Sequence, residues 1–205
     1  MAGEPESEAR LQERLAGGDE AALGELFSRY RERLRRMVEL RLDRRLLGRV
    51  SASDVLQDSY LEALKRLSHY GGEEKMPIHL WLRLITGQRI TDLHRQHFGA
   101  AMRDIGREVP INRSIMPQAT SISLAAQLVA ELESPSQAAV KAEALAQLEA
   151  ALESMEPLDR EVLALRHFEE LTNDEVAEVL GIKKAAASNR YVRALKRLRD
   201  VLGIQ

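Results

Sequence analysis

The chain has 205 residues and a formal net charge of −2, and 44% of its residues are hydrophobic, 30% charged and only 4% aromatic. Ala, Leu, Glu and Arg dominate, and these residues favour helices, whereas the β-branched and aromatic residues typical of strands are scarce. The composition predicts an all-α protein rather than a disordered one, and the length allows either one domain or two small ones.

The chain contains no cysteine, which excludes disulfides and thiolate metal sites. Residues 1–8 carry acids where a secretory leader would have basic residues followed by an apolar stretch. No apolar run is long enough to cross a bilayer. We therefore expect a soluble, cytoplasmic protein with no membrane contact.

The first helical domain is expected over residues 8–108. Helical periodicity runs over 8–45, breaks near Gly48 and resumes over 54–67, where a turn signal follows. A further helix is expected over 79–95.

A stretch with little charge separates this domain from the next. Residues 109–136 mix Pro, Ser, Thr and Asn, which is typical of a linker, with a short helix expected near 124–132. The second helical domain is expected over 137–205, with Pro157 at a helix start and Gly181 at a turn.

The end of the chain has the pattern of a helix-turn-helix. Thr172 and Glu175 form a capping box that predicts a helix start, and Gly181 supplies the turn. In the following helix, 185–198, apolar residues recur at three- and four-residue spacing. Such a module places its second helix in the major groove of DNA, although an ordinary helical hairpin would show similar spacing.

The charge of this last helix favours nucleic acid. Seven basic residues and no acid lie between Lys183 and Arg199, and each phosphate that a cation neutralises releases counterions. We expect four side chains nearest the bases: Lys184, Ser188, Asn189 and Arg193. The remaining candidates would contact phosphates: Lys183, Arg190, Lys196 and Arg197. The alternative is a solvated helix face.

A second candidate surface lies on the helix expected over 54–67. Opposite its buried stripe, one face carries Asp54, Gln57, Asp58 and Leu61. Two carboxylates four residues apart repel each other on an isolated helix, which points to a basic partner. Alternatively, Asp54 only favours the helix start.

The helix that follows mixes one aromatic residue with several basic or histidine side chains. Its candidates for binding single-stranded bases and phosphates are Trp81, Arg83, Arg89, His94 and Arg95. A lone tryptophan on a helix is, alternatively, a core residue.

Three phrases in this order resemble the extracytoplasmic-function group of sigma factors: SDVLQDSYLEA, LWLRLITGQRITDLHRQ and the terminal helix-turn-helix. This group keeps only the second and fourth regions of the larger sigma family. The resemblance covers about 21–107 and 144–201. It implies two small helical domains and a function in transcription initiation.

The resemblance also implies partners. The face of Asp54, Gln57 and Asp58 would bind the clamp helices of the largest subunit of core RNA polymerase, and the flap of the second subunit would be a further contact. The helix from Trp81 and the preceding loop, which contains Lys75, would open the downstream promoter box. The last helix would read the upstream box as duplex, and an anti-sigma factor or a regulatory kinase would control the protein.

Two features depart from the family pattern. Many relatives begin the recognition helix with Pro-x-Gly-Thr-Val, where this chain has Lys-Lys-Ala-Ala-Ala at 183–187, so no promoter sequence can be transferred. Relatives also carry more acid before Asp54, where this chain has Ser51 and Ser53. Phosphorylation would add about −1.5 to −2 charges there, although serines also cap helices.

Other function classes explain less of the sequence. A stand-alone helix-turn-helix regulator would bind duplex DNA without polymerase and leaves the amino-terminal surfaces unexplained. An adaptor would not need the acid-free last helix. His94 and His97 lack a third ligand in a metal-binding pattern, and there is no Gly-rich phosphate loop. We therefore expect no metal, no cofactor and no enzymatic activity.

Overall fold

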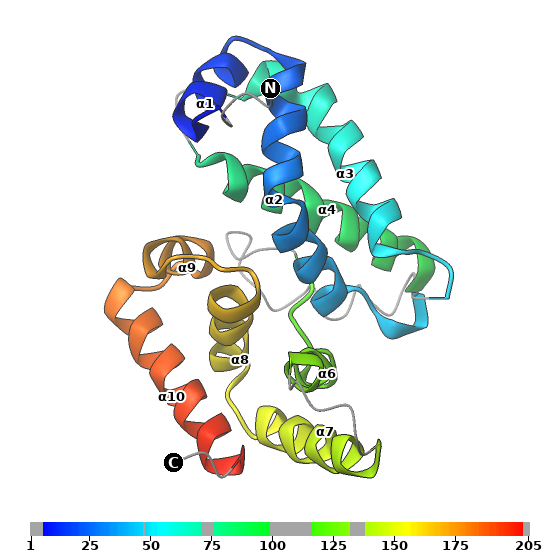
Figure 1. Cartoon of the computed structure of the whole chain (residues 1–205), viewed down its shortest axis with the longest axis vertical. Helices are drawn as coiled ribbons and strands as arrows, with labels where there is room; N and C mark the ends of the chain where they lie inside the picture. The colour runs from blue at the N-terminus through cyan, green and yellow to red at the C-terminus, as the bar shows by residue number, and fades with distance from the viewer. Residues whose placement is uncertain (1–5, 47, 71–75, 99–115, 132–137, 203–205) are drawn as a thin grey trace, which may run out of the picture.

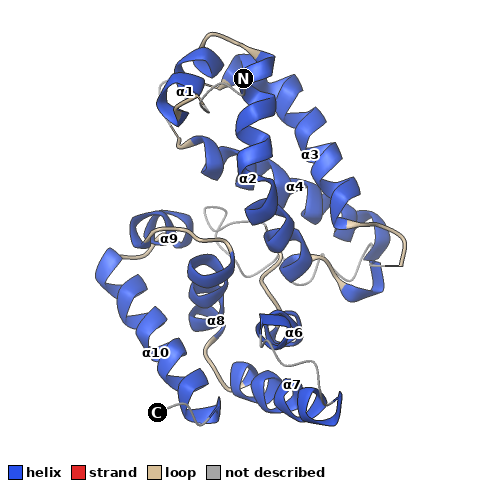
Figure 2. Cartoon of the chain, viewed as in Figure 1, coloured by secondary structure: helices blue, strands red, loops and turns tan. Residues whose placement is uncertain are grey.

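The computed structural model describes residues 6–46, 48–70, 76–98, 116–131 and 138–202 (Figure 1). The helices in chain order are α1 (Glu8–Ala16), α2 (Glu20–Arg41), α3 (Ala52–Arg66), α4 (Ile78–Phe98), α6 (Ser121–Glu131), α7 (Ala138–Glu153), α8 (Pro157–Leu163), α9 (Asn173–Leu180) and α10 (Lys184–Leu202). Shorter helical segments are η1 (Arg44–Leu46), η2 (Leu67–His69) and the π-helical η3 (Ala164–Phe168). The described part of the chain contains no strand, which confirms the all-α prediction (Figure 2).

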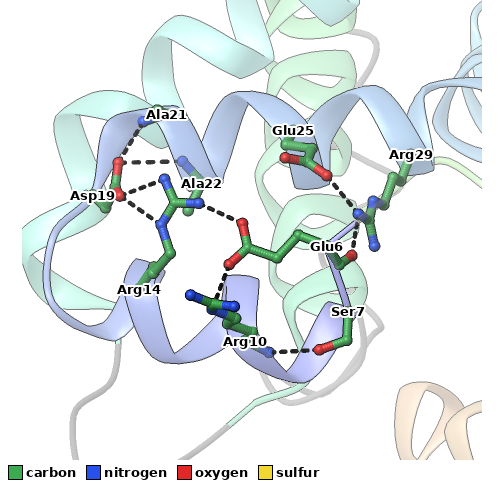
Figure 3. Close-up of polar contacts among 9 residues, drawn as sticks. All are labelled: Glu6, Ser7, Arg10, Arg14, Asp19, Ala21, Ala22, Glu25 and Arg29. Atoms are coloured by element: carbon green, nitrogen blue, oxygen red, sulfur yellow. Dashed lines mark hydrogen bonds and ion pairs between the residues drawn. The ribbon is translucent and has the colours of Figure 1, made fainter. Parts of the chain in front are cut away.

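Helices α1 to α4 form an amino-terminal unit around one hydrophobic core. The predicted continuous stretch over 8–45 is in fact two helices that meet at a corner. Gly18 adopts φ +83 there, and Asp19 caps α2 by accepting hydrogen bonds from two backbone N–H groups (Figure 3). Arg14 donates to the Asp19 carboxylate at 2.8 Å and ties the two helices together.

Helix α4 packs against α2 and α3 within the amino-terminal unit and also faces the carboxy-terminal unit. Its buried residues therefore occur around most of its circumference rather than on one stripe. Ile85 belongs to the core of the amino-terminal unit, whereas Leu80 packs with residues of α8 and α9.

Helices α6, α7, α8 and α10 share a second core. Helix α6 confirms the short helix expected near 124–132, but it does more than connect two domains. Leu124 is fully buried against Leu148 and Leu152 of α7. The segment predicted as a linker therefore contributes a helix to the carboxy-terminal core.

The helix-turn-helix forms as its sequence predicts. Thr172 and Glu175 complete a capping box at the start of α9, and Gly181 ends the helix in the left-handed conformation, with φ +62. Helix α10 buries Ala187, Ala194 and Leu198, whereas Leu195 is 39% exposed.

A buried ion cluster joins the two units. The guanidinium of Arg41 is fully buried and contacts the carboxylates of Glu161 and Glu169. Glu169 also accepts from Arg83 of α4 at 2.7 Å. The carboxylates of Glu161 and Glu169 thus compensate the buried charge of Arg41 across the contact between the two units.

Candidate functional site

The outer face of α3 presents a stripe of exposed side chains formed by Asp54, Gln57 and Leu61. Leu61 is a large apolar side chain that is 47% exposed. Asp54 completes a capping box with Ser51, and its carboxylate accepts from the Ser51 backbone N–H at 2.9 Å and from the hydroxyl at 2.7 Å. The side-chain hydrogen bond from Ser51 lowers the pKa of Asp54, which keeps a negative charge at this edge of the stripe.

Asp58, the fourth residue expected on this face, is partly covered by a neighbouring helix. Its carboxylate forms an ion pair of 2.6 Å with Arg89 of α4. Both side chains line a groove of about 280 Å³ between α3 and α4, together with Leu61, Arg66, Gln88 and Asp92. The sequence had assigned Asp58 and Arg89 to different partners, whereas the structure brings them together beside the exposed Leu61.

Two of the basic residues assigned to DNA on α4 are buried. Arg83 is only 7% exposed and is bound to Glu169, and its contact with DNA stays a prediction. His94 is 6% exposed, and its Nε2 accepts from the backbone N–H of Asp43 at 3.1 Å. Burial lowers the pKa of His94, which favours the neutral imidazole that can accept this bond.

The other candidates of this region are more accessible or lie outside the described residues. Trp81 is half-buried and packs on Tyr70, with ring centroids 4.9 Å apart. Arg95 is exposed and lies 3.6 Å from the Asp92 carboxylate. Lys75 lies outside the described residues. Trp81 packs against the core of the amino-terminal unit and remains partly exposed, and its contact with bases stays a prediction.

Helix α10 turns an exposed polar face to solvent. The exposed candidates on this helix and at its start are Lys183, Lys184, Ser188, Asn189, Arg193, Lys196 and Arg197. Asn173 of α9 donates to the Ser188 hydroxyl at 3.0 Å, and Lys184 pairs with Asp174 at 2.8 Å. These contacts fix the start of α10 against α9 and leave Asn189 facing outward.

Three arginines of α10 lie beside preceding helices. Arg190 and Arg193 both bind the carboxylate of Asp159 on α8, at 2.6 and 3.0 Å. Arg197 donates to the Ser154 hydroxyl at 3.0 Å. The Arg193 guanidinium pairs with Asp159 but its side chain is 58% exposed, so its position nearest the bases stays a prediction. Spacing along α10 could not reveal this ion pair, since Asp159 lies in a different helix.

The exposed faces of α3 and α10 suit recognition of a macromolecule. Among the described residues, no group of three or more His, Cys, Asp or Glu side chains is placed to hold a metal ion. Nor does any described helix combine the length and the apolar character that a membrane span requires.

Comparisons with known proteins agree with this reading. The family described as sigma-70, region 4, matches residues 145–198. The ECF RNA polymerase sigma factor SigD of Mycobacterium bovis is 29% identical over 183 residues, which cover 89% of this chain and 78% of SigD. SigD of Mycobacterium tuberculosis H37Rv matches to the same extent.

The fold is also that of a solved structure, CnrH in complex with the cytosolic domain of CnrY. The TM-score is 0.55 at 21% identity, and the match covers 97% of this chain and 98% of that chain. The chain is thus similar in sequence to extracytoplasmic-function sigma factors over 89% of its length, residues 145–198 match sigma-70 region 4, and the structural match shows a shared fold.

Proposed function

We propose that this chain binds core RNA polymerase through the outer face of α3 and directs it to promoters whose upstream box is read by α10. The observation that carries the proposal is the exposed face of α10 over residues 184–198, which contain no acid and belong to the segment that matches sigma-70 region 4. The chain acts by recognition, and the chemistry of RNA synthesis belongs to the polymerase.

The α3 face has the character of a protein interface. An exposed apolar residue, Leu61, lies one helical turn beyond Asp58 and two turns beyond Asp54, and a groove adjoins it. Interfaces commonly combine an apolar centre with a polar rim. The negative rim favours a basic partner surface and accelerates its encounter.

The α10 face suits duplex DNA. Lys184 and Lys196 can neutralise phosphates, which supplies affinity without sequence preference. Asn189 can pair with the N6 and N7 edge of adenine, which supplies sequence preference. Arg190 and Arg193 hold α10 against α8 and so orient the helix for both kinds of contact.

Binding of the melted downstream strand is proposed for the region around Trp81. The Trp81 and Tyr70 rings offer a stacking surface, and the exposed Arg95 offers a phosphate contact on the same helix as Trp81. Arg83 can take part only after its bond to Glu169 breaks, which requires the two units to separate.

The test is transcription in vitro with purified core polymerase and a library of genomic promoter fragments. We expect defined transcripts that need both the chain and the polymerase, and we expect the chain to co-purify with the polymerase. Specific binding to duplexes by a chain that fails to join polymerase would instead identify a stand-alone regulator.

A further inference from the structure

Val192 is an apolar side chain in an unexpected place. It is 64% exposed, more than any other large hydrophobic side chain in the described part of the chain. It lies three residues after Asn189 and four after Ser188, so the three side chains share one face of α10. It belongs to none of the hydrophobic clusters of the fold.

Local structure gives no reason for a valine at this position. Valine is a weaker helix former than the Ala, Lys and Arg residues that surround it, because its branched side chain loses rotamer freedom. Ala187, Ala194 and Leu198 already form the buried face of α10. The position of Val192 is therefore best explained by what the outer face touches.

The outer face of α10 has a specific apolar target in the major groove. Thymine presents its C5-methyl group there, and small apolar side chains are the groups that contact it. Ala185 is exposed two turns before Val192, and Asn189 lies between them. The face thus alternates hydrogen-bonding and apolar groups along the groove.

We propose that Val192 contacts the C5-methyl group of a thymine in the upstream promoter box and sets the base preference at that position. This inference rests on the proposed function, because it requires α10 to lie in the major groove. Val192 would recognise DNA through an apolar contact, whereas the other candidate residues of this face act through hydrogen bonds and charge.

The experiment uses the full chain with core RNA polymerase and a promoter selected from a pool with a randomised upstream box. Each thymine of the selected box is then replaced by uracil, which removes only the methyl group. At one position the wild-type complex should bind about fourfold more weakly, the effect expected for one buried methyl-sized group.

Val192→Ala should weaken binding to the thymine promoter to a similar extent and should bind the uracil and thymine promoters equally. Alanine favours helix, so the variant should fold. The matched control is Leu84→Ala, which removes a 45% exposed aliphatic side chain from α4. The control should keep the wild-type ratio of thymine to uracil binding.

Equal binding of thymine and uracil promoters by the wild-type complex would overturn the inference, as would unchanged discrimination in Val192→Ala. If Val192→Ala keeps its DNA preference but loses polymerase, the valine is a protein contact and the inference fails. A chain that never joins polymerase selects no promoter, and this result would overturn the proposed function together with the inference.

Discussion

Replacing Arg41 with methionine should destabilise the fold more than any exposed substitution. The Arg41 side chain is fully buried, and the side chains of its partners Glu161 and Glu169 are 9% and 4% exposed. The substitution keeps most of the side-chain volume. It leaves the two buried carboxylates without the positive charge of Arg41. Only Glu169 retains a cationic partner, Arg83.

Removing one partner of a buried ion pair costs about 3–5 kcal/mol. For a chain of this size, each kcal/mol lowers Tm by about 2–4 °C, so the midpoint should fall by roughly 6–20 °C. The matched control is Arg35→Met, because Arg35 forms two ion pairs on the same helix but is 40% exposed. Exposed pairs of this kind contribute about 0–1 kcal/mol each.

Thermal unfolding followed by circular dichroism measures both variants. Adding Glu161→Gln to Arg41→Met should recover part of the lost stability. The amide still accepts from the Ala119 backbone N–H, and Glu169 and Arg83 remain as a balanced pair. If Arg41→Met and Arg35→Met unfold at the same temperature, the cluster is not buried in solution and the described contact between the units is wrong.

Burial lowers the pKa values of His79 and His94 in the folded chain, so the unfolded chain binds more protons as the pH falls. The folded state therefore keeps its full stability above about pH 6.5, the ordinary pKa of histidine, and loses stability as the pH falls through the pKa values of the folded chain. The urea concentration at the unfolding midpoint should therefore decrease as the pH is lowered from 7.5 to 5.5. If His94→Gln leaves this dependence of the midpoint on pH unchanged, the prediction is contradicted. Asn189→Ala should weaken binding to the selected promoter by about 1–3 kcal/mol, whereas Lys196→Ala should weaken binding to all duplexes and reduce the salt slope by about 1, as filter binding over a salt series can show. Gly181→Ala should lower the free energy of unfolding by about 1–2 kcal/mol in urea titrations, because φ is +62 there; an unchanged value would contradict the left-handed turn.

Signals contained within a few residues predicted the local fold. The capping box of Thr172 and Glu175 and the turn at Gly181 determine a helix start and a helix end without help from distant residues. The corner at Asp19 was missed because Leu15 and Leu23 on either side both face the same core, so the hydrophobic pattern continues across the break. The sequence predicted the existence of helix α6 but not its packing on α7, which depends on residues more distant in the chain.

The sequence predicted which residues of the candidate site are exposed, but it did not predict the ion pairs that they form with other helices. Exposure of Gln57, Leu61 and Asn189 follows from helical periodicity alone. The ion pairs that bury Arg83 and turn Arg193 toward Asp159 join residues from separate helices. Such pairs depend on how helices pack, and the order of charges along one helix does not contain that information.

The most direct test of the central claim concerns the α3 face and core RNA polymerase. Reversing Asp54 and Asp58 would also remove a helix cap and an ion pair. Gln57 and Leu61 are better targets, because both are exposed and the described part of the chain gives them no side-chain hydrogen bond or ion pair. The variant is Gln57→Arg with Leu61→Arg, which should change stability by less than about 0.5 kcal/mol.

The control is Glu13→Arg on α1, a single exposed substitution that changes the net charge by the same amount. Affinity for purified core polymerase is measured for all three proteins after circular dichroism has shown them to be folded. The account predicts that Glu13→Arg binds like the wild type and that the α3 variant loses binding. The two new arginines repel a basic partner, and the apolar contact of Leu61 is lost. A folded α3 variant that binds polymerase with wild-type affinity would contradict the account.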